Sequence, residues 1–515
     1  MVFARPVPIV HSFRPFPVPT PVVTSTRESV MSRHSLGVLA ALFLAALPVA
    51  AQSRLPAIRT LGPITARSAE PLGAVSTAVP LPDGRVLVND VLQRRVVMFD
   101  STLAQVSVVA DTTSATANAY GARGGGLIGY RGDSALFIDP ASLSMITVNP
   151  RGELTTVRAV PRANEIQALS GAQGRPGFDA QGRLIYRATP RPRAARRDAR
   201  PVVGNFVMPE LPDSAPIVRL DMANRAGDLA SRASDTVAAL KINRPDVKVT
   251  QGADGRISVN TTVHPMPSLD EWALLADGTV AVIRGHDFHV DRYKPDGTVT
   301  SSPKLPFDWQ RLDDDAKAFI IDSARTAMEK QREEAQRMMA NAGGPMAFMQ
   351  GGGGEVMMSA MGGGAMGGGM GGGMVGMSIT VGGGAGGGPP QRGGQGGGPG
   401  GRGGAGGGTG GPGGANFQLP PINLINPNEL PDYRPPFLAQ AALGDLDGNL
   451  WVRTTAAPTG DGGAIYYVID ANDTVSDRVQ VPQGRIIAGF GKGGVVYLAF
   501  RDTEGRAFLE TVRLR

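Results

Sequence analysis

The chain has 515 residues with 71 glycines, 41 prolines and only 5% aromatic residues, so it is rich in turns and builds its core largely from Val, Leu, Ile and Ala. Its formal charge of +6 falls to +3 (47 basic minus 44 acidic residues) when residues 1–51 are left out, too small an excess for a nucleic-acid-binding surface. The lack of cysteine excludes disulfides, thiol catalysis and thiolate metal sites.

Residues 31–51 have the pattern of a secretory signal peptide. A short cationic start at Met31 is followed by an apolar run from Leu36 to Leu47 and by small residues up to Ala51. The run is shorter than the roughly 20 apolar residues that span a bilayer, so a retained anchor is the weaker alternative. We expect translation from Met31 after an upstream extension and cleavage near Ala51. The product is then periplasmic or extracellular, with membrane contact only through the signal.

Short apolar strands joined by Asp-Gly turns dominate the rest of the chain. Such turns between alternating apolar runs signal hairpins, because both turn residues tolerate positive φ. The units recur about every 40 residues, as four-stranded propeller blades do. The sequence therefore predicts an all-β fold, a six-bladed β-propeller, with blades near residues 64–111, 120–160, 165–240, 250–306, 437–482 and 484–515.

The sixth blade shows only three strands, so its fourth is expected from residues 55–61, near the start of the mature chain. This pairing would close the ring and remove its exposed edges.

Two insertions interrupt the series of blades. The smaller, residues 189–214, contains arginines between prolines and is interpreted as a solvated loop. The larger separates blades 1–4 (residues 52–309) from blades 5–6 (residues 433–515). Its first part, residues 310–342, has helical periodicity, with acidic residues at its N-terminal end. Its second part, residues 343–432, is a Gly/Met-rich tract, expected to be disordered, with a return segment.

Residues 86–100 carry a repeat motif. A strand ends at Asp90, a short polar turn follows, and then come Arg95, Phe99 and Asp100 in the order Arg-hydrophobic-x-x-Phe-Asp. In this respect the chain resembles the NHL-like, bacterial six-bladed β-propeller family. The resemblance implies a blade rather than a particular chemistry.

Two sets of polar residues are candidate ligand-binding sites. Asn89 and Asp90 end a strand at a place where lactonase-like propellers have acids that face the ligand. In NHL-like repeats the same acid holds the turn or meets the arginine, here Arg95. We favour this structural interpretation of both Asp90 and Arg95.

The second set is His286, Asp287, His289 and Asp291. If a strand begins at Asp287, then Asp287, His289 and Asp291 share one face and could bind a divalent metal or transfer protons. The alternative, which we favour, is an outer strand on which His289 is hydrogen-bonded to a neighbouring acid.

No nucleophile elbow, zinc-protease motif, phosphate loop or dinucleotide fingerprint occurs in the sequence. No catalytic or metal-ligating residues are therefore assigned, and no cofactor is expected, with Ca²⁺ or another divalent metal as the alternative. The sequence favours an exported, non-catalytic binding or scaffold protein for a protein or glycan partner. The alternative is a metal-dependent, lactonase-like hydrolase or lyase with its site in the central channel.

Overall fold

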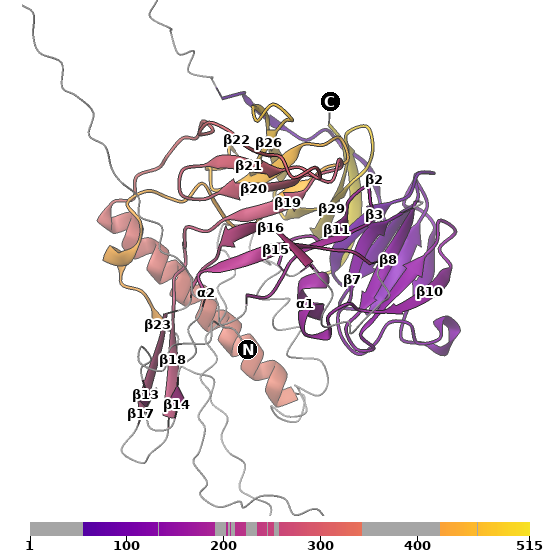
Figure 1. Cartoon of the computed structure of the whole chain (residues 1–515), viewed down its shortest axis with the longest axis horizontal. Coiled ribbons are helices and arrows are strands. Elements are labelled where there is room, and N and C mark those ends of the chain that lie inside the picture. The colour runs from indigo at the N-terminus through magenta and orange to yellow at the C-terminus, as the bar shows by residue number, and fades with distance from the viewer. Residues whose placement is uncertain are drawn as a thin grey trace, which may run out of the picture. The chain divides into compact units, whose positions relative to one another are not determined.

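Six β-sheets, five of four strands and one of five, form the blades of a propeller around a common axis (Figure 1). The computed structural model describes residues 55–514 except 132, 172, 191–201, 204–205, 208–211, 223–233, 245, 252–256, 342–422 and 461. The predicted fold class, an all-β six-bladed propeller, is confirmed. The predicted signal peptide, the arginine-rich run and the Gly/Met-rich tract lie outside the described residues.

In each blade a run of strands follows outward from the innermost strand in chain order, and blades 5 and 6 each gain a further outer strand from the start of the chain. Blade 1 contains β3–β6, at Val75–Pro80, Val86–Asp90, Arg95–Phe99 and Val106–Ala110. Blade 2 contains β7–β10, at Gly126–Tyr130, Ser134–Asp139, Ser144–Val148 and Leu154–Ala159. Blade 3 contains β11, β12, β15 and β16, at Gly177–Phe178, Leu184–Arg187, Ser214–Leu220 and Ser234–Lys241.

The last three blades are built in the same way. Blade 4 contains β19–β22, at Glu271–Leu274, Val280–Arg284, His289–Tyr293 and Val299–Ser301. Blade 5 contains β24–β27, at Phe437–Gly444, Leu450–Thr454, Gly462–Ile469 and Val475–Pro482. Blade 6 contains β28–β30, at Arg485–Phe490, Val495–Arg501 and Ala507–Arg513.

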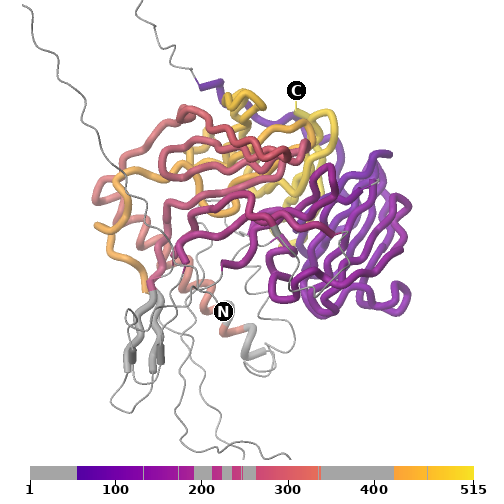
Figure 2. The backbone as a smooth tube through the Cα atoms, viewed as in Figure 1, coloured from indigo at the N-terminus to yellow at the C-terminus, as the bar shows by residue number. Residues whose placement is uncertain are grey.

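The ring is closed by a strand from the other end of the chain. β2 (Ile64–Arg67) pairs antiparallel with β30 and supplies the fourth strand of blade 6. Figure 2 shows this indigo segment beside the yellow C-terminal strands. The closing strand thus lies just beyond the expected residues 55–61. Those residues include β1 (Ile58–Thr60), which pairs parallel with β27 as a fifth strand of blade 5.

Residues 246–263 differ from the sequence prediction, which placed the start of blade 4 there. β17 (Asp246–Gln251) and β18 (Ile257–Val263) form a hairpin, and β18 pairs with β23 (Asn423–Leu424) from the far side of the large insertion. The predicted hairpin is therefore present, but its strands pair with β23 and do not belong to the sheet of blade 4. A second small hairpin, β13 (Val202–Val203) with β14 (Phe206–Val207), lies within the smaller insertion.

The helix in the large insertion is α2 (Asp314–Asn341). The Asp313 carboxylate accepts a hydrogen bond of 2.8 Å from the amide of Ala316 and so caps the first turn. Ile320 and Ile321 are buried against Leu430 and Leu438. Among the described residues no helix has the length and apolar character needed to cross a membrane. The remaining helical segments are α1, η1, η2 and η5, at Ile166–Leu169, Ser114–Thr116, Ala163–Glu165 and Pro427–Glu429.

The hydrophobic core lies between neighbouring blades. Leu87 of blade 1 packs with Phe137 of blade 2, and Trp451 of blade 5 packs with Val496 of blade 6. The hairpin turns that connect the first two strands of a blade need a left-handed residue, as at Gly278, where φ is 85°. Because the first two strands of a blade are antiparallel, the first strand begins at the end of the axis where the second strand finishes. We call this end of the axis the entry end.

Candidate functional site

Asn89, one of the predicted ligand-binding residues, is fully buried in β4 and joins blade 1 to blade 2. Its amide nitrogen donates to Oγ of Ser76 (2.9 Å) and to the carbonyl of Gly125 (2.7 Å). Its amide oxygen accepts a hydrogen bond of 3.1 Å from the hydroxyl of Tyr120. All these partners belong to the protein, so Asn89 acts as an inter-blade tie.

Asp90 and Arg95 are brought together by the turn between β4 and β5. The Asp90 carboxylate accepts hydrogen bonds of 2.9 Å from the amides of Gly73 and Ala74 and one of 3.3 Å from Nε of Arg95. Arg95 also forms an ion pair of 2.7 Å with Glu70. The carboxylate thus fixes the turn and the start of the innermost strand, as the structural interpretation expects.

The second predicted set lies at the turn between β20 and β21 of blade 4, and the structure brings three of its four members together. Nδ1 of His289 lies 2.6 Å from Oδ1 of Asp287, and Nε2 lies 3.4 Å from Oδ1 of Asp291. His286 is exposed at the turn.

Asp291 also has partners other than His289. Nε of Arg284 lies 2.7 Å from one carboxylate oxygen, and the Ser301 hydroxyl lies 2.5 Å from the other. Burial raises the pKa of Asp291, but the hydrogen bonds from Ser301 and Arg284 outweigh burial and leave the pKa lowered. In the described part of the chain, no group of three His, Asp or Glu side chains has an arrangement that could hold a metal ion. This set therefore forms a local hydrogen-bond network on the third strand, away from the axis.

A different group of charged side chains meets at the entry end of the axis. We define the axial cluster as Arg175, Arg187, Glu271, Arg453 and Tyr466. Arg175 precedes β11, Arg187 ends β12, Glu271 begins β19, and Arg453 and Tyr466 are paired in blade 5. The sequence analysis did not predict any of these residues.

Glu271 is the acidic member of the axial cluster and is only 4% exposed. The amide of Gln440, on the innermost strand of blade 5, donates a hydrogen bond of 2.9 Å to its Oε1. Burial raises the pKa of the Glu271 carboxyl to about 7, although Gln440, Arg187 and Arg453 all act to lower it. A carboxyl with this pKa can both take up and release a proton near neutrality.

Arg175 crosses the axis. Its Nη2 donates a hydrogen bond of 2.9 Å to the carbonyl of Ile487 in β28, the innermost strand of blade 6. Blade 6 lies opposite blade 3 in a ring of six. Burial lowers the pKa of Arg175 to about 10, with Tyr466 acting in the other direction.

Arg187 and Arg453 lie on either side of Glu271, one from blade 3 and one from blade 5. Burial lowers the pKa of Arg187, and Glu271 opposes the shift. Nε of Arg187 is buried without a hydrogen-bond partner. In the described part of the chain no salt bridge joins Glu271 to either arginine. The cluster therefore combines one proton-transfer group with three cations.

Solvent reaches the innermost strands near this end. Ser76 in β3, Gln440 in β24 and Ile486 in β28 are all exposed, although they lie on the innermost strands of their blades. Ile486, an aliphatic residue, is 44% exposed. The entry end is thus open to water at several points around the axis.

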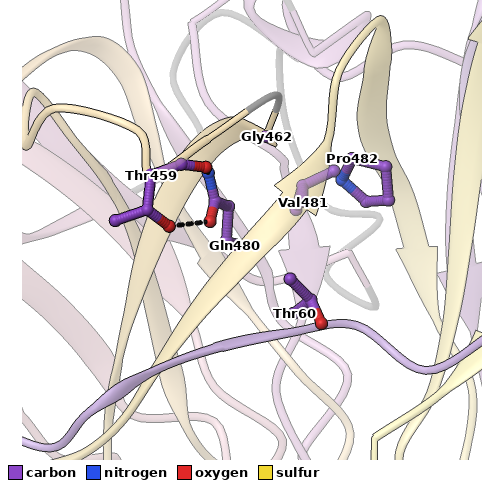
Figure 3. Close-up of a pocket in the computed structure, with 6 residues that line it drawn as sticks. All are labelled: Thr60, Thr459, Gly462, Gln480, Val481 and Pro482. Atoms are coloured by element: carbon purple, nitrogen blue, oxygen red, sulfur yellow. Dashed lines mark hydrogen bonds between the residues drawn. The ribbon is translucent and has the colours of Figure 1, made fainter.

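A pocket of about 330 Å³ lies elsewhere, at the outer edge of blade 5 (Figure 3). It is lined by Thr60, Thr459, Gly462, Gln480, Val481 and Pro482. The Thr459 hydroxyl donates a hydrogen bond of 2.6 Å to the Gln480 side chain, which is therefore fixed. None of the lining side chains is ionisable, so the pocket offers no group for acid–base chemistry.

No protein-family model and no curated protein sequence matches the chain. Its fold is similar to that of regucalcin, a calcium-binding protein from Agrobacterium tumefaciens, with 10% identity, 89% of this chain and 98% of that chain covered and a TM-score of 0.32. A luciferin-regenerating enzyme has 9% identity, coverage of 87% and 93% and a TM-score of 0.33.

A putative gluconolactonase is a third similar structure, with 12% identity, coverage of 88% and 95% and a TM-score of 0.30. These TM-scores carry no argument about the role of this chain. The coarser part of the expected resemblance, a six-bladed propeller, is confirmed by the six sheets of the structure itself.

The comparisons nevertheless correct the expected function. The sequence favoured a non-catalytic binding or scaffold protein and disfavoured an enzyme, whereas the structural neighbours include proteins named as enzymes. That expectation is therefore contradicted and is not kept. The chemistry has to be argued from the residues of this chain.

Proposed function

We propose that the protein is an enzyme, a hydrolase of carboxylic esters or lactones, with its active site at the entry end of the axis. The observation that carries this proposal is Glu271, a buried carboxyl at the first position of an innermost strand, with a pKa of about 7 and guanidinium groups on two sides. Perturbed carboxyl groups next to fixed charges are characteristic of catalytic sites.

The proposed reaction uses Glu271 as a general base and then as a general acid. Its carboxylate takes a proton from water while the water oxygen attacks the carbonyl carbon and the carbonyl electron pair moves to oxygen. The arginines of the axial cluster stabilise the resulting oxyanion. When the intermediate collapses, the bond to the leaving oxygen breaks and that oxygen receives the proton from Glu271. The products are an acid and an alcohol.

The lactonase-like alternative included a divalent metal, and one structural neighbour is described as calcium-binding. Calcium prefers six to eight oxygen ligands with several carboxylates. The axial cluster has one carboxyl and three guanidiniums, and cations repel a metal ion. The residues do not fit calcium, and no step is assigned to a metal.

Two further expectations from the sequence stay proposals. Export after cleavage near Ala51 is supported by the signal-like pattern of residues 31–51 and can be checked by N-terminal sequencing of the mature protein. Membership of the NHL-like group is supported by the contact of Asp90 with Arg95, which matches the role of these motif positions.

The proposed activity is tested by screening the mature protein against a panel of γ- and δ-lactones and aryl esters, together with Glu271→Gln. The amide keeps the acceptor for the Gln440 amide but cannot transfer the proton. We expect hydrolysis by the wild type and a loss of at least about hundredfold in kcat for the variant. Glu504→Gln, an exposed change in blade 6, is the matched control. Unchanged hydrolysis in Glu271→Gln, or no hydrolysis of any lactone or ester, would contradict the proposal.

A further inference from the structure

We propose that Arg175, Arg187 and Arg453 form a binding site for a small organic oxyanion, a molecule carrying carboxylate or phosphate groups, at the entry end of the axis. That this anion is the substrate rests on the proposed function. The binding itself is argued from the charges and contacts of the cluster.

The first argument is the excess of positive charge. Three guanidiniums meet one carboxyl, so the net charge is +2 with Glu271 ionised and +3 with it protonated. The neighbouring acid, Asp270, is already engaged. It accepts hydrogen bonds from Nη1 of Arg284 (2.8 Å) and from the amides of Lys241 (2.9 Å) and Gly285 (3.2 Å). Among the described residues no salt bridge joins Arg175, Arg187 or Arg453 to an acid.

The second argument is that three largely buried arginines elsewhere in the described residues have acidic partners. Arg95 has Glu70 and Asp90, Arg292 has Asp473, and Arg485 has Glu510, at distances between 2.6 and 3.3 Å. The arginines of the axial cluster have no salt bridge among the described residues, and Nε of Arg187 is buried without a partner. The three arginines are half-buried, and a partly desolvated cation without a counter-ion gains binding energy from an anion in solution.

The third argument is the chemistry of the donors. Guanidinium groups present parallel N–H donors that match the two oxygens of a carboxylate or phosphate. Cations from blades 3 and 5 lie on either side of Glu271, the proposed base, so an anion held between them is placed next to the proton-transfer group. The exposed residues Ser76, Gln440 and Ile486 show that solvent, and with it a small solute, reaches these strands.

The test measures binding without turnover. The full mature protein is titrated by calorimetry with malonate, with inorganic phosphate and with malonamide, the uncharged analogue of malonate, at constant ionic strength set with NaCl. We expect malonate and phosphate to bind and malonamide not to bind. The anion with the lower Kd indicates whether the site prefers a carboxylate or a phosphate. Binding of neither anion above the NaCl background would overturn the inference.

Variants connect the binding to the cluster. Arg187→Gln and Arg453→Gln should each weaken the binding of malonate at least about tenfold, because a charge-assisted hydrogen bond is lost. Arg506→Gln, an exposed arginine paired with Asp502 in blade 6, should leave it unchanged. Equal affinities in all three variants would place the anion elsewhere. If Arg187→Gln fails to fold, the Arg453→Gln variant and the malonamide comparison still test whether the axial arginines bind the anion.

Glu271→Gln separates this inference from the proposed function. The variant removes a negative charge, so it should bind malonate at least as tightly as the wild type even if it has lost turnover. Loss of turnover without anion binding by either protein would refute the oxyanion site and leave the proton-transfer role intact. Anion binding with undiminished turnover in the variant would refute the proton-transfer role and leave the site intact.

Discussion

The backbone amide of Gln440 donates a hydrogen bond of 2.9 Å to Oε1 of Glu271, and this contact joins the innermost strands of blades 4 and 5. Gln440 has a φ of 59° and lies where the pairing of β24 with β25 shifts register. The local bulge turns the amide toward the carboxyl instead of the neighbouring strand. A backbone irregularity therefore positions the only acidic residue of the axial cluster.

Glu271 should make the stability of the protein depend on pH. Its pKa rises from 4.5 to about 7 on folding, so its contribution to stability is fully present below pH 4.5 and is lost as the pH rises through 7. The loss amounts to about 3 kcal/mol above pH 8. We expect Glu271→Gln to be more stable than the wild type at pH 8 and similar at pH 4.5, as measured by urea unfolding. A parallel pH dependence of the two proteins would show that the carboxyl is not perturbed.

Close contact between innermost strands should make two glycines intolerant of alanine. A Cβ at Gly489 would lie 2.2 Å from the carbonyl oxygen of Ala78 on β3, and one at Gly444 would lie 2.3 Å from that of Leu274 on β19. Each substitution should lower the free energy of unfolding by about 2 kcal/mol. Gly129 is the matched control, because a Cβ on this innermost strand would meet its nearest atom at 3.9 Å. Equal losses at all three positions would mean that strand propensity, not contact, sets the effect.

Asn89 should be a stability residue. Asn89→Ala removes the hydrogen bonds to Tyr120 and Gly125 and leaves both partners buried, so we expect a loss of about 3 kcal/mol in the free energy of unfolding. In protein that is still folded, kcat should stay within about twofold of wild type, because the residue has no free polar atom to offer a ligand. A large fall in kcat with unchanged stability would show that Asn89 contributes to turnover and not to stability.

His289 should be dispensable for turnover. It lies on the third strand of blade 4 between Asp287 and Asp291. Without His289, Asp291 keeps its contacts with Arg284 and Ser301. For His289→Gln we expect kcat/KM within about twofold of wild type and a loss of less than about 1 kcal/mol in stability. A loss of turnover comparable to that of Glu271→Gln would locate the chemistry in blade 4 instead of at the axis.

The axial cluster left one weak signal in the sequence. The second strands of blades 1 to 4 end on charged residues, and two of these are Asp90 and Arg187. An alignment of the blades on the turn glycines Gly84 and Gly182 places Arg187 opposite Asn89, one residue before the position of Asp90. It does not tell Asn89, whose side-chain polar atoms all have partners within the protein, from Arg187, whose Nε is buried without a hydrogen-bond partner.

The sequence by itself determined the period of the fold. Asp-Gly turns and alternating strands are local features, so they predict hairpins, and hairpins at blade spacing predict a propeller. The contacts of Asp90 are made with residues within 17 positions, so they are local enough for the sequence to indicate them. Only the tertiary structure decided that β2, instead of β1, closes the ring and that residues 246–263 leave blade 4 to pair with β23. It also brought together the axial cluster, because Arg175, Glu271 and Arg453 come from blades that are far apart in the chain and adjoin only when the ring forms.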